Sequence, residues 1–322
     1  MIPTLSEATS RQTQEAIGAR ARAGSALAYL WDLIRKSFAA WLDDYAPSMG
    51  AALAYYTMFS LAPFLILIIA VGGLVFGADA ARGAIVSQLR DLIGEEGAVA
   101  VQGLLTSASH PAKSIIASII AVLTLLLGAT SVFAELQSSL DRIWRAPALP
   151  QTSGLWTLLR QRLLSFGMIV SIGFLLLVSL VVSAALSALG TWSGGFLPGW
   201  EVLLQVVNLV VSFGITTVLF AMVYRILPRV WVAWTDVWIG AAVTALLFNV
   251  GKLAIGLYLG KAGVTSGFGA AGSLVAILVW VYYSAQVFLL GAEFTWVFAH
   301  SRGSRAGETP EPAPAIPTRS DA

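Results

Sequence analysis

The sequence predicts an all-α integral membrane protein with six transmembrane helices, an N-terminal amphipathic interfacial helix and a helical loop on the outer side. Of its 322 residues, 57% are hydrophobic and only 11% are charged, whereas a soluble globular chain carries about 25% charged residues. Several long stretches contain no Asp, Glu, Lys or Arg. These stretches are apolar on every side, unlike the alternating strands of a membrane β-barrel, so helices are expected.

The composition also excludes several classes of function. The chain has no cysteine, which excludes a disulfide scaffold, a thiolate zinc site and cysteine catalysis. The two histidines, His110 and His300, fall on opposite predicted sides of the membrane, so one chain cannot form a two-histidine metal site or a histidine triad. The net charge is only +2, without the basic, aromatic-rich face of a nucleic-acid-binding protein. We expect no enzyme activity, no cofactor, no metal and no nucleic-acid partner.

Residues 1–23 are expected to be a flexible segment, because they lack the apolar core and cleavage pattern of a secretory signal. The residues that follow predict an amphipathic helix, since their apolar side chains recur in steps of three and four. The stripe consists of Leu27, Leu30, Trp31, Ile34, Phe38, Trp41, Leu42 and Tyr45. We expect an interfacial helix on the cytoplasmic face; a helix packed against the bundle is the alternative.

The six spans belong to a membrane domain of residues 24–300. A helix needs about 20 apolar residues to cross the hydrocarbon core, and the charge-free stretches satisfy this at about 52–76, 113–135, 164–188, 203–225, 237–259 and 272–298. The fifth span reaches that length only with Lys252 inside it. Between the first two spans, weaker amphipathic helices at Ala80–Ile93 and Gly97–Ser107 are expected to cap the outer surface. Residues 301–322, rich in Pro, Ala and Ser, are expected to form a disordered cytoplasmic tail.

The distribution of basic residues predicts the orientation. The N-terminal segment, the even-numbered loops and the tail carry 14 Lys and Arg residues, against four on the other side when Lys252 is set aside. Because positive residues accumulate on the cytoplasmic side, both termini are expected to be cytoplasmic.

Four of the predicted spans carry polar side chains along one helical face. These are Tyr56, Ser60 and Pro63 on the first, Thr124, Gly128, Ser131 and Glu135 on the second, Gln205, Asn208, Ser212 and Thr216 on the fourth, and Tyr282, Gln286 and Glu293 on the sixth. They either pack through interhelical hydrogen bonds of about 0.6 kcal/mol each or line a shared polar cavity or translocation route. Pro63 removes one backbone hydrogen bond, which suits a gate or a packed bend.

Lys252 and Glu293 are the charges deepest inside spans. Lys252 is expected about 7 Å outside the middle of its span and Glu293 about 12 Å inside the middle of its own, so we do not expect them to pair. Glu293 instead shares the cytoplasmic level with a set of charged residues that predicts an inner gate, namely Glu135, Arg142, Arg225 and Asp236. Lys252 either forms an anion-attracting or titrating site beside Asn249, or snorkels toward the outer interface.

The segment Gly267–Gly272 fits the dinucleotide pattern G-x-G-x-x-G literally. No strand precedes it and no acidic residue follows at the ribose-binding distance, so the pattern does not indicate a cofactor site. A flexible re-entrant or gating turn is the better interpretation.

Several strings are similar to the YihY/BrkB family of bacterial inner-membrane proteins, long catalogued as ribonuclease BN. They are AALAYYTMFSLAP at 51–63, AELQ at 134–137 with DRIW at 141–144, RILP at 225–228, DVWIGA at 236–241, the segment 258–272, and WVYYSAQ at 280–286 with GAEF at 291–294. The resemblance covers about residues 30–300. It implies a six-span inner-membrane protein whose relatives are described as transporters or virulence-related factors. The ribonuclease label finds no support, because RNA hydrolysis needs metal-ligating groups or a His acid–base pair in the cytoplasm.

We therefore expect a transporter or exporter of a solute or lipid across the bacterial inner membrane. No ATP-binding motif is present, so transport would be passive, ion-coupled or partner-driven. The alternative is a non-transporting scaffold in envelope assembly or virulence; an intramembrane enzyme lacks a nucleophile–base pair. The expected partners are membrane lipids and a solute or lipid substrate, with a homo-oligomer left open.

Overall fold

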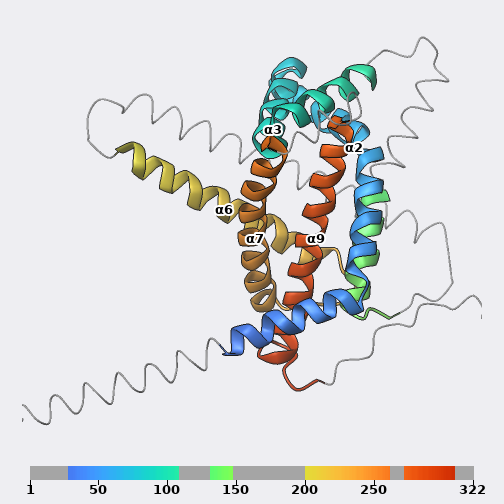
Figure 1. Cartoon of the computed structure of the whole chain (residues 1–322), viewed down its shortest axis with the longest axis vertical. Coiled ribbons are helices and arrows are strands. Elements are labelled where there is room, and N and C mark those ends of the chain that lie inside the picture. The colour runs from blue at the N-terminus through green and yellow to red at the C-terminus, as the bar shows by residue number, and fades with distance from the viewer. Residues whose placement is uncertain (1–27, 109–130, 148–199, 262–271, 309–322) are drawn as a thin grey trace, which may run out of the picture.

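All regular elements in the described part of the chain are helices (Figure 1). The computed structural model describes residues 28–108, 131–147, 200–261 and 272–308. The elements are a helix at 28–43, α2 (Ala46–Phe76), α3 (Ala78–Ala108), a helix at 131–143, α6 (Trp200–Ile226), α7 (Trp234–Lys261) and α9 (Gly272–Ser301). No strand occurs in these ranges, which confirms the all-helical class.

Three of the predicted spans correspond to helices that are long and apolar enough to cross a membrane. Within the described residues these are Val206–Ile226, Trp234–Lys252 and Ile277–Ser301, in the fourth, fifth and sixth predicted spans. The second predicted span lies mostly outside the described residues, and the third lies wholly outside them.

The helix of the first predicted span begins earlier than expected, at Ala46 and not at residue 52. Two features set this start. Tyr45 adopts a left-handed conformation with φ of 58°, which separates α2 from helix 28–43. Pro47 then lies in the first turn, where its missing N–H would have no partner within the helix.

The outer loop also differs from the prediction. Two helices separated at residues 94–97 were expected, but α3 runs through this point as one helix of 31 residues. An isolated glycine inside a helix costs only about 1 kcal/mol, so Gly94 and Gly97 do not end it.

Helix α9 lies between α2 and α7, and α6 packs on the other side of α7 (Figure 1). Glycines allow α7 and α9 to approach closely, as small residues do in membrane bundles. Gly240 lies against Thr295, Gly291 lies against Thr244, and Gly251 lies against Tyr283. These contacts fix the antiparallel register of the two helices.

The largest apolar core lies at the end of the bundle where α7 begins and α9 ends. It includes the fully buried Leu140, Ile143, Tyr224, Val237 and Leu289. The hydroxyl of Tyr224 donates to the carbonyl oxygen of Phe288 at 2.6 Å, so the buried hydroxyl of Tyr224 has a hydrogen-bond partner.

Helix 28–43 crosses this end of the bundle (Figure 1). Leu33 and Ser37 are buried against the bundle, whereas Trp31 is 69% exposed. The exposed residues of the predicted apolar stripe are Leu30, Trp31, Ile34, Phe38, Leu42 and Tyr45. Large apolar side chains facing outward along one stripe favour the interfacial interpretation over a fully packed helix.

Both ends of the described chain meet at this end of the bundle. The hydroxyls of Tyr29 and Ser301 lie 3.1 Å apart, and the Arg302 guanidinium lies 3.8 Å from the centroid of the Tyr29 ring. Residues 302–308 form turns that pack on the bundle and are not part of a disordered tail. That this end is cytoplasmic remains a prediction from the Lys and Arg count.

Candidate functional site

Charged side chains are buried where α2 begins and α9 ends. Asp44, between helix 28–43 and α2, is fully buried. Arg145 donates from Nη1 to both carboxylate oxygens of Asp44 at 2.6 Å, and Nε of Arg142 lies 3.9 Å from Asp44 Oδ1. Together with Glu293 these residues form what we call the Asp44 cluster. One carboxylate therefore faces two guanidinium groups in a site of low dielectric, where charge pairs are strong.

Two backbone conformations position this cluster. Tyr45 and Arg145 have φ of 58° and 54° and are the non-glycine residues with positive φ in the described part of the chain. Each ends a helix, and the Arg142 guanidinium lies 5.7 Å from the Tyr45 ring centroid. Such conformations cost about 1–3 kcal/mol each and gather at functional sites. Here they bring two helix ends together so that Asp44 and Arg145 meet.

Glu293 is the buried charge without a hydrogen bond. It lies on α9 with 0% exposure, and neither carboxylate oxygen has a hydrogen-bond partner among the described residues. The charged groups that act on it are Asp44, Arg145 and Asp43, and Asp44 is near enough to share a hydrogen bond if one of the two carboxyl groups carries a proton. An ionised carboxylate buried without hydrogen bonds is strongly disfavoured. Glu293 is therefore placed to hold a proton.

A second ion pair fastens helix 131–143 to the loop before α7. Asp141 accepts from the backbone N–H of Arg229 at 2.8 Å, and Nε of Arg229 lies 2.9 Å from the other carboxylate oxygen. Burial raises the pKa of the Asp141 carboxyl above its usual value, while the Arg229 hydrogen bond and charge oppose this rise. Gln137 adds a hydrogen bond to the carbonyl oxygen of Leu227 at 3.0 Å.

The other residues predicted for the inner gate make different contacts. Asp236 is buried and accepts from the Ser304 hydroxyl at 2.6 Å, which ties α7 to the segment after α9. Arg225 donates to the carbonyl oxygen of Val232, and its guanidinium lies 4.8 Å from the Trp231 ring centroid. Arg142 lies beside Asp44 and Glu135 is half-buried on helix 131–143.

The polar edge predicted on α2 and α9 is only partly buried. The Ser60 hydroxyl donates to the Thr57 carbonyl oxygen of its own helix at 3.3 Å. Tyr56 and Tyr282 are 40% and 38% exposed. Gln286 donates to the Pro47 carbonyl oxygen at 3.3 Å and so ties α9 to the start of α2. Pro63 lies within α2, but its side chain is outside the described ones.

On α6, Thr216 donates to the Ser212 carbonyl oxygen at 2.8 Å, and Asn208 is exposed. Thr124, Gly128 and the side chain of Gln205 lie outside the described residues.

The register of α7 and α9 keeps Lys252 away from Glu293. Lys252 follows Gly251, which lies against Tyr283, so it is about ten residues, or about 15 Å, from the level of Glu293. Asn249 donates to the Ala245 carbonyl oxygen of its own helix at 2.8 Å. The segment Gly267–Gly272 lies outside the described residues apart from Gly272.

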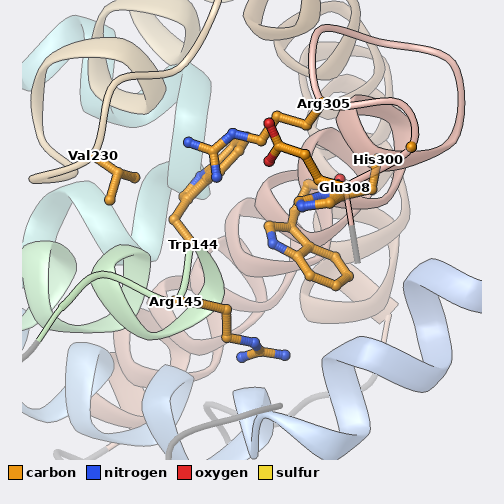
Figure 2. Close-up of a pocket in the computed structure, with 8 residues that line it drawn as sticks. Trp144, Arg145, Val230, His300, Arg305 and Glu308 are labelled. Carbon is orange, nitrogen blue, oxygen red and sulfur yellow. Dashed lines mark hydrogen bonds between the residues drawn. The ribbon is translucent and has the colours of Figure 1, made fainter. Parts of the chain in front are cut away.

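A cavity of about 490 Å³ adjoins the Asp44 cluster (Figure 2). It is lined by Trp144, Arg145, Val230, Trp296, His300, Arg305, Gly307 and Glu308. Figure 2 shows Arg145 on one side of the cavity, while Arg305, His300 and Glu308 lie across the cavity from it. Within the described ranges, no three His, Asp or Glu side chains are placed to hold a metal ion.

Sequence reasoning missed Asp44, Arg145 and the cavity residues. A pair of acids, Asp43 and Asp44, directly before a long apolar run was an available signal. Arg145 follows the DRIW string that contributed to the family resemblance. The ion pair between Asp44 and Arg145 could not be predicted, because 101 positions separate the two residues. Residue spacing does not predict contacts between the ends of helices that are distant in the sequence.

Comparison with known proteins gives a consistent family assignment. The model of the family described as Virulence factor BrkB matches residues 37–316. A UPF0761 membrane protein of Ralstonia nicotianae is 28% identical over 253 residues, which cover 78% of this chain and 55% of that protein. One of Verminephrobacter eiseniae is 28% identical over 257 residues, covering 78% of this chain and 58% of that protein.

A third relative, a UPF0761 membrane protein of Pseudomonas paraeruginosa, is 26% identical over 275 residues, with coverage of 84% and 64%. The chain therefore spans less than two thirds of the length of these curated relatives. No solved structure matches the chain.

Proposed function

Because the chain belongs to the BrkB virulence-factor family of membrane proteins, we propose that it moves a solute or a lipid across the bacterial inner membrane and that Glu293 couples this movement to a proton. The proposal depends on one observation. Glu293 is fully buried on a membrane-spanning helix, and both of its carboxylate oxygens lack a hydrogen bond within the described residues.

Burial without a partner makes a purely structural role for Glu293 expensive. Removing a carboxylate from water costs several kcal/mol, even after relaxation of the surroundings, and a glutamine or leucine would fill similar space without this cost. Ionisable residues inside membrane spans are therefore functional by default. A proton neutralises the carboxylate, and its release restores the charge.

The surrounding charges convert this release into movement. Arg145 is bonded to Asp44 while Glu293 is neutral. When Glu293 becomes ionised, a second negative charge appears beside Asp44, and Arg145 is drawn between the two carboxylates. Because Asp44 precedes α2, Arg145 follows helix 131–143 and Glu293 lies on α9, this redistribution shifts three elements relative to one another at the inner end of the bundle.

Reconstituted vesicles test the proposal. Purified full-length protein is placed in liposomes that contain a pH-sensitive dye and a fluorescent phospholipid, and a panel of solutes is added under an imposed pH gradient. We expect proton flux that depends on one of these substrates, and its loss in Glu293→Gln. Asp32→Asn is the matched control, because Asp32 is an exposed carboxylate on helix 28–43. Substrate-dependent flux that is equal in wild type and Glu293→Gln would contradict coupling at Glu293.

A non-transporting scaffold is the second candidate. It is favoured by the polar groups of Ser60, Thr216 and Asn249, which bond to backbone oxygens of their own helices and do not converge on one another. For a scaffold, no member of the lipid and solute panel moves across the vesicle membrane with either wild type or Glu293→Gln.

A further inference from the structure

The cavity beside Trp144 shares Arg145 with the proton coupling proposed above, but its other lining residues take no part in that coupling. Three segments form its walls: the end of helix 131–143, the loop before α7, and the end of α9 with the turns that follow. Its volume of about 490 Å³ lies within the range of small-molecule sites. Such sites combine aromatic walls with a few oriented polar groups, and this cavity has both.

Trp144 and Arg305 are the hydrogen-bond donors at one wall of the cavity. The Trp144 side chain is 2% exposed, and its indole Nε1 is buried without a hydrogen-bond partner among the described residues. Buried N–H groups without partners are rare, so each one calls for an explanation. Arg305 donates from Nη2 to the Trp231 carbonyl oxygen at 3.0 Å, and its guanidinium lies 5.3 Å from the Trp144 ring centroid. That bond uses one of the five N–H donors of the guanidinium.

His300 adds a further polar group to the cavity wall. Its Nδ1 lies 2.8 Å from the Trp296 carbonyl oxygen. A carbonyl oxygen only accepts, so Nδ1 carries the proton and Nε2 is left for another partner. The imidazole and the Trp296 ring lie with centroids 4.4 Å apart, which orients the imidazole against the cavity wall.

The charges around the cavity leave one positive and one negative group without ion pairs. Arg145 is neutralised by Asp44, with Nη1 at 2.6 Å from the carboxylate. Arg305 and Glu308 remain, and among the described residues no ion pair joins them to each other or to a third group. Complementary ligands match the charge pattern of a site. A bare anion matches only half of this pattern, whereas a zwitterion matches both charges.

We propose that this cavity binds a phosphoethanolamine-type zwitterion. The phosphate accepts hydrogen bonds from the Arg305 guanidinium, as charge-assisted phosphate sites do, and the Trp144 ring forms the adjoining wall. The ammonium group lies at the Glu308 carboxylate with the Trp296 ring beside it, a combination that attracts cations. The same chemistry occurs in two sources, the headgroup of phosphatidylethanolamine and soluble glycerophosphoethanolamine.

The position of the cavity makes a lipid headgroup reachable. Val230 lines the cavity, and its neighbour Trp231 is 66% exposed. Trp231, Trp234 and Trp238 are all exposed at the end of the bundle that helix 28–43 crosses. Exposed tryptophans gather at the level of lipid headgroups, so the cavity lies at the depth where headgroups are found.

Binding is measured on the purified full-length protein and does not require transport. A failure to bind the ligand is therefore a separate result from a failure to transport a substrate. Calorimetry in detergent uses two soluble probes, glycerophosphoethanolamine and inorganic phosphate. Native mass spectrometry then compares phosphatidylethanolamine with phosphatidylglycerol. We expect tighter binding of the zwitterion in both comparisons. Binding of the soluble probe is then measured with the protein in phosphatidylethanolamine nanodiscs. Weaker probe binding than in detergent would identify the lipid headgroup as the ligand, and unchanged probe binding would identify the soluble ester.

Three variants make the assignment falsifiable. Arg305→Gln should weaken binding of glycerophosphoethanolamine by about tenfold to a hundredfold, as expected for loss of a charged hydrogen bond. Glu308→Gln, at an exposed position that does not threaten folding, should weaken the zwitterion about tenfold and leave inorganic phosphate unchanged. Arg302→Gln is the control, because Arg302 packs on Tyr29 outside the cavity.

Three results would overturn the proposal. The first is that neither soluble probe and neither lipid binds. The second is that Arg305→Gln and Arg302→Gln have equal effects. The third is that phosphatidylglycerol and inorganic phosphate bind as tightly as the zwitterions, with no effect of Glu308→Gln, which would indicate a plain anion site.

Discussion

Replacing Asp44 by asparagine tests the Asp44 cluster most severely. The substitution removes the ion pair between Arg145, whose side chain is 12% exposed, and Asp44, which is 0% exposed. Breaking a buried pair by removing one partner costs about 3–5 kcal/mol, because the other charge stays buried and uncompensated. At roughly 1–2 °C per kcal/mol for a chain of 322 residues, we expect Tm to fall by about 3–10 °C.

Helix 28–43, which ends directly before Asp44, provides a matched control. Lys36 and Asp32 lie 2.7 Å apart, with side chains 57% and 44% exposed. The pair is as short as that of Asp44, but it is exposed to solvent, and such pairs contribute about 0–1 kcal/mol. Asp32→Asn should therefore shift Tm by no more than about 2 °C.

Both variants are heated in the same detergent, and unfolding is measured as the loss of the monodisperse peak in size-exclusion chromatography. Equal shifts in Asp44→Asn and Asp32→Asn would refute the reasoning, because they would show that burial does not decide the strength of these pairs.

Three further predictions concern other parts of the bundle. Glu293→Gln should leave Tm nearly unchanged, because it replaces a protonated carboxyl group by an amide that is also neutral and fills similar space. A fall as large as that of Asp44→Asn would assign Glu293 a stabilising partner. Gly240→Ala should lower the free energy of unfolding by about 1–3 kcal/mol, because the added methyl group overpacks against α9. Gly214→Ala should not, because the space around Gly214 is open. Equal denaturant midpoints for the two variants would contradict this. Arg229→Gln removes the guanidinium charge that opposes the raised pKa of Asp141 and keeps the backbone N–H that donates to it. Because the carboxyl pKa of the native state then rises further, stability should fall more steeply as pH rises above about 4. An unchanged pH profile of Tm would contradict this.

The helical class could be predicted from sequence because lipid exposure leaves a local signal. The runs that became α6, α7 and α9 are long and predominantly apolar. In lipid only helices and closed barrels satisfy the backbone, and barrel strands would alternate apolar with polar residues. The stripe on helix 28–43 was likewise readable, since spacing alone determines which side chains share a helical face.

The helix ends and the buried cluster could not be predicted in the same way. The start of α2 at Ala46 depends on the left-handed conformation of Tyr45, and the α3 segment continues through Gly94 because the cost of one glycine is small. Arg145 reaches Asp44 only because helix ends distant in sequence meet. Sequence periodicity placed Glu293 at the inner level of its span, but it could not show which arginine and which carboxylate would lie beside it.

Infrared difference spectroscopy of the purified protein tests most directly whether Glu293 exchanges a proton. A pH jump in wild type should remove the absorption band of a protonated carboxyl group, Glu293→Gln should lack that band, and Asp141→Asn should retain it. Identical spectra for wild type and Glu293→Gln would show that no exchangeable proton resides on Glu293 and would contradict its role in coupling.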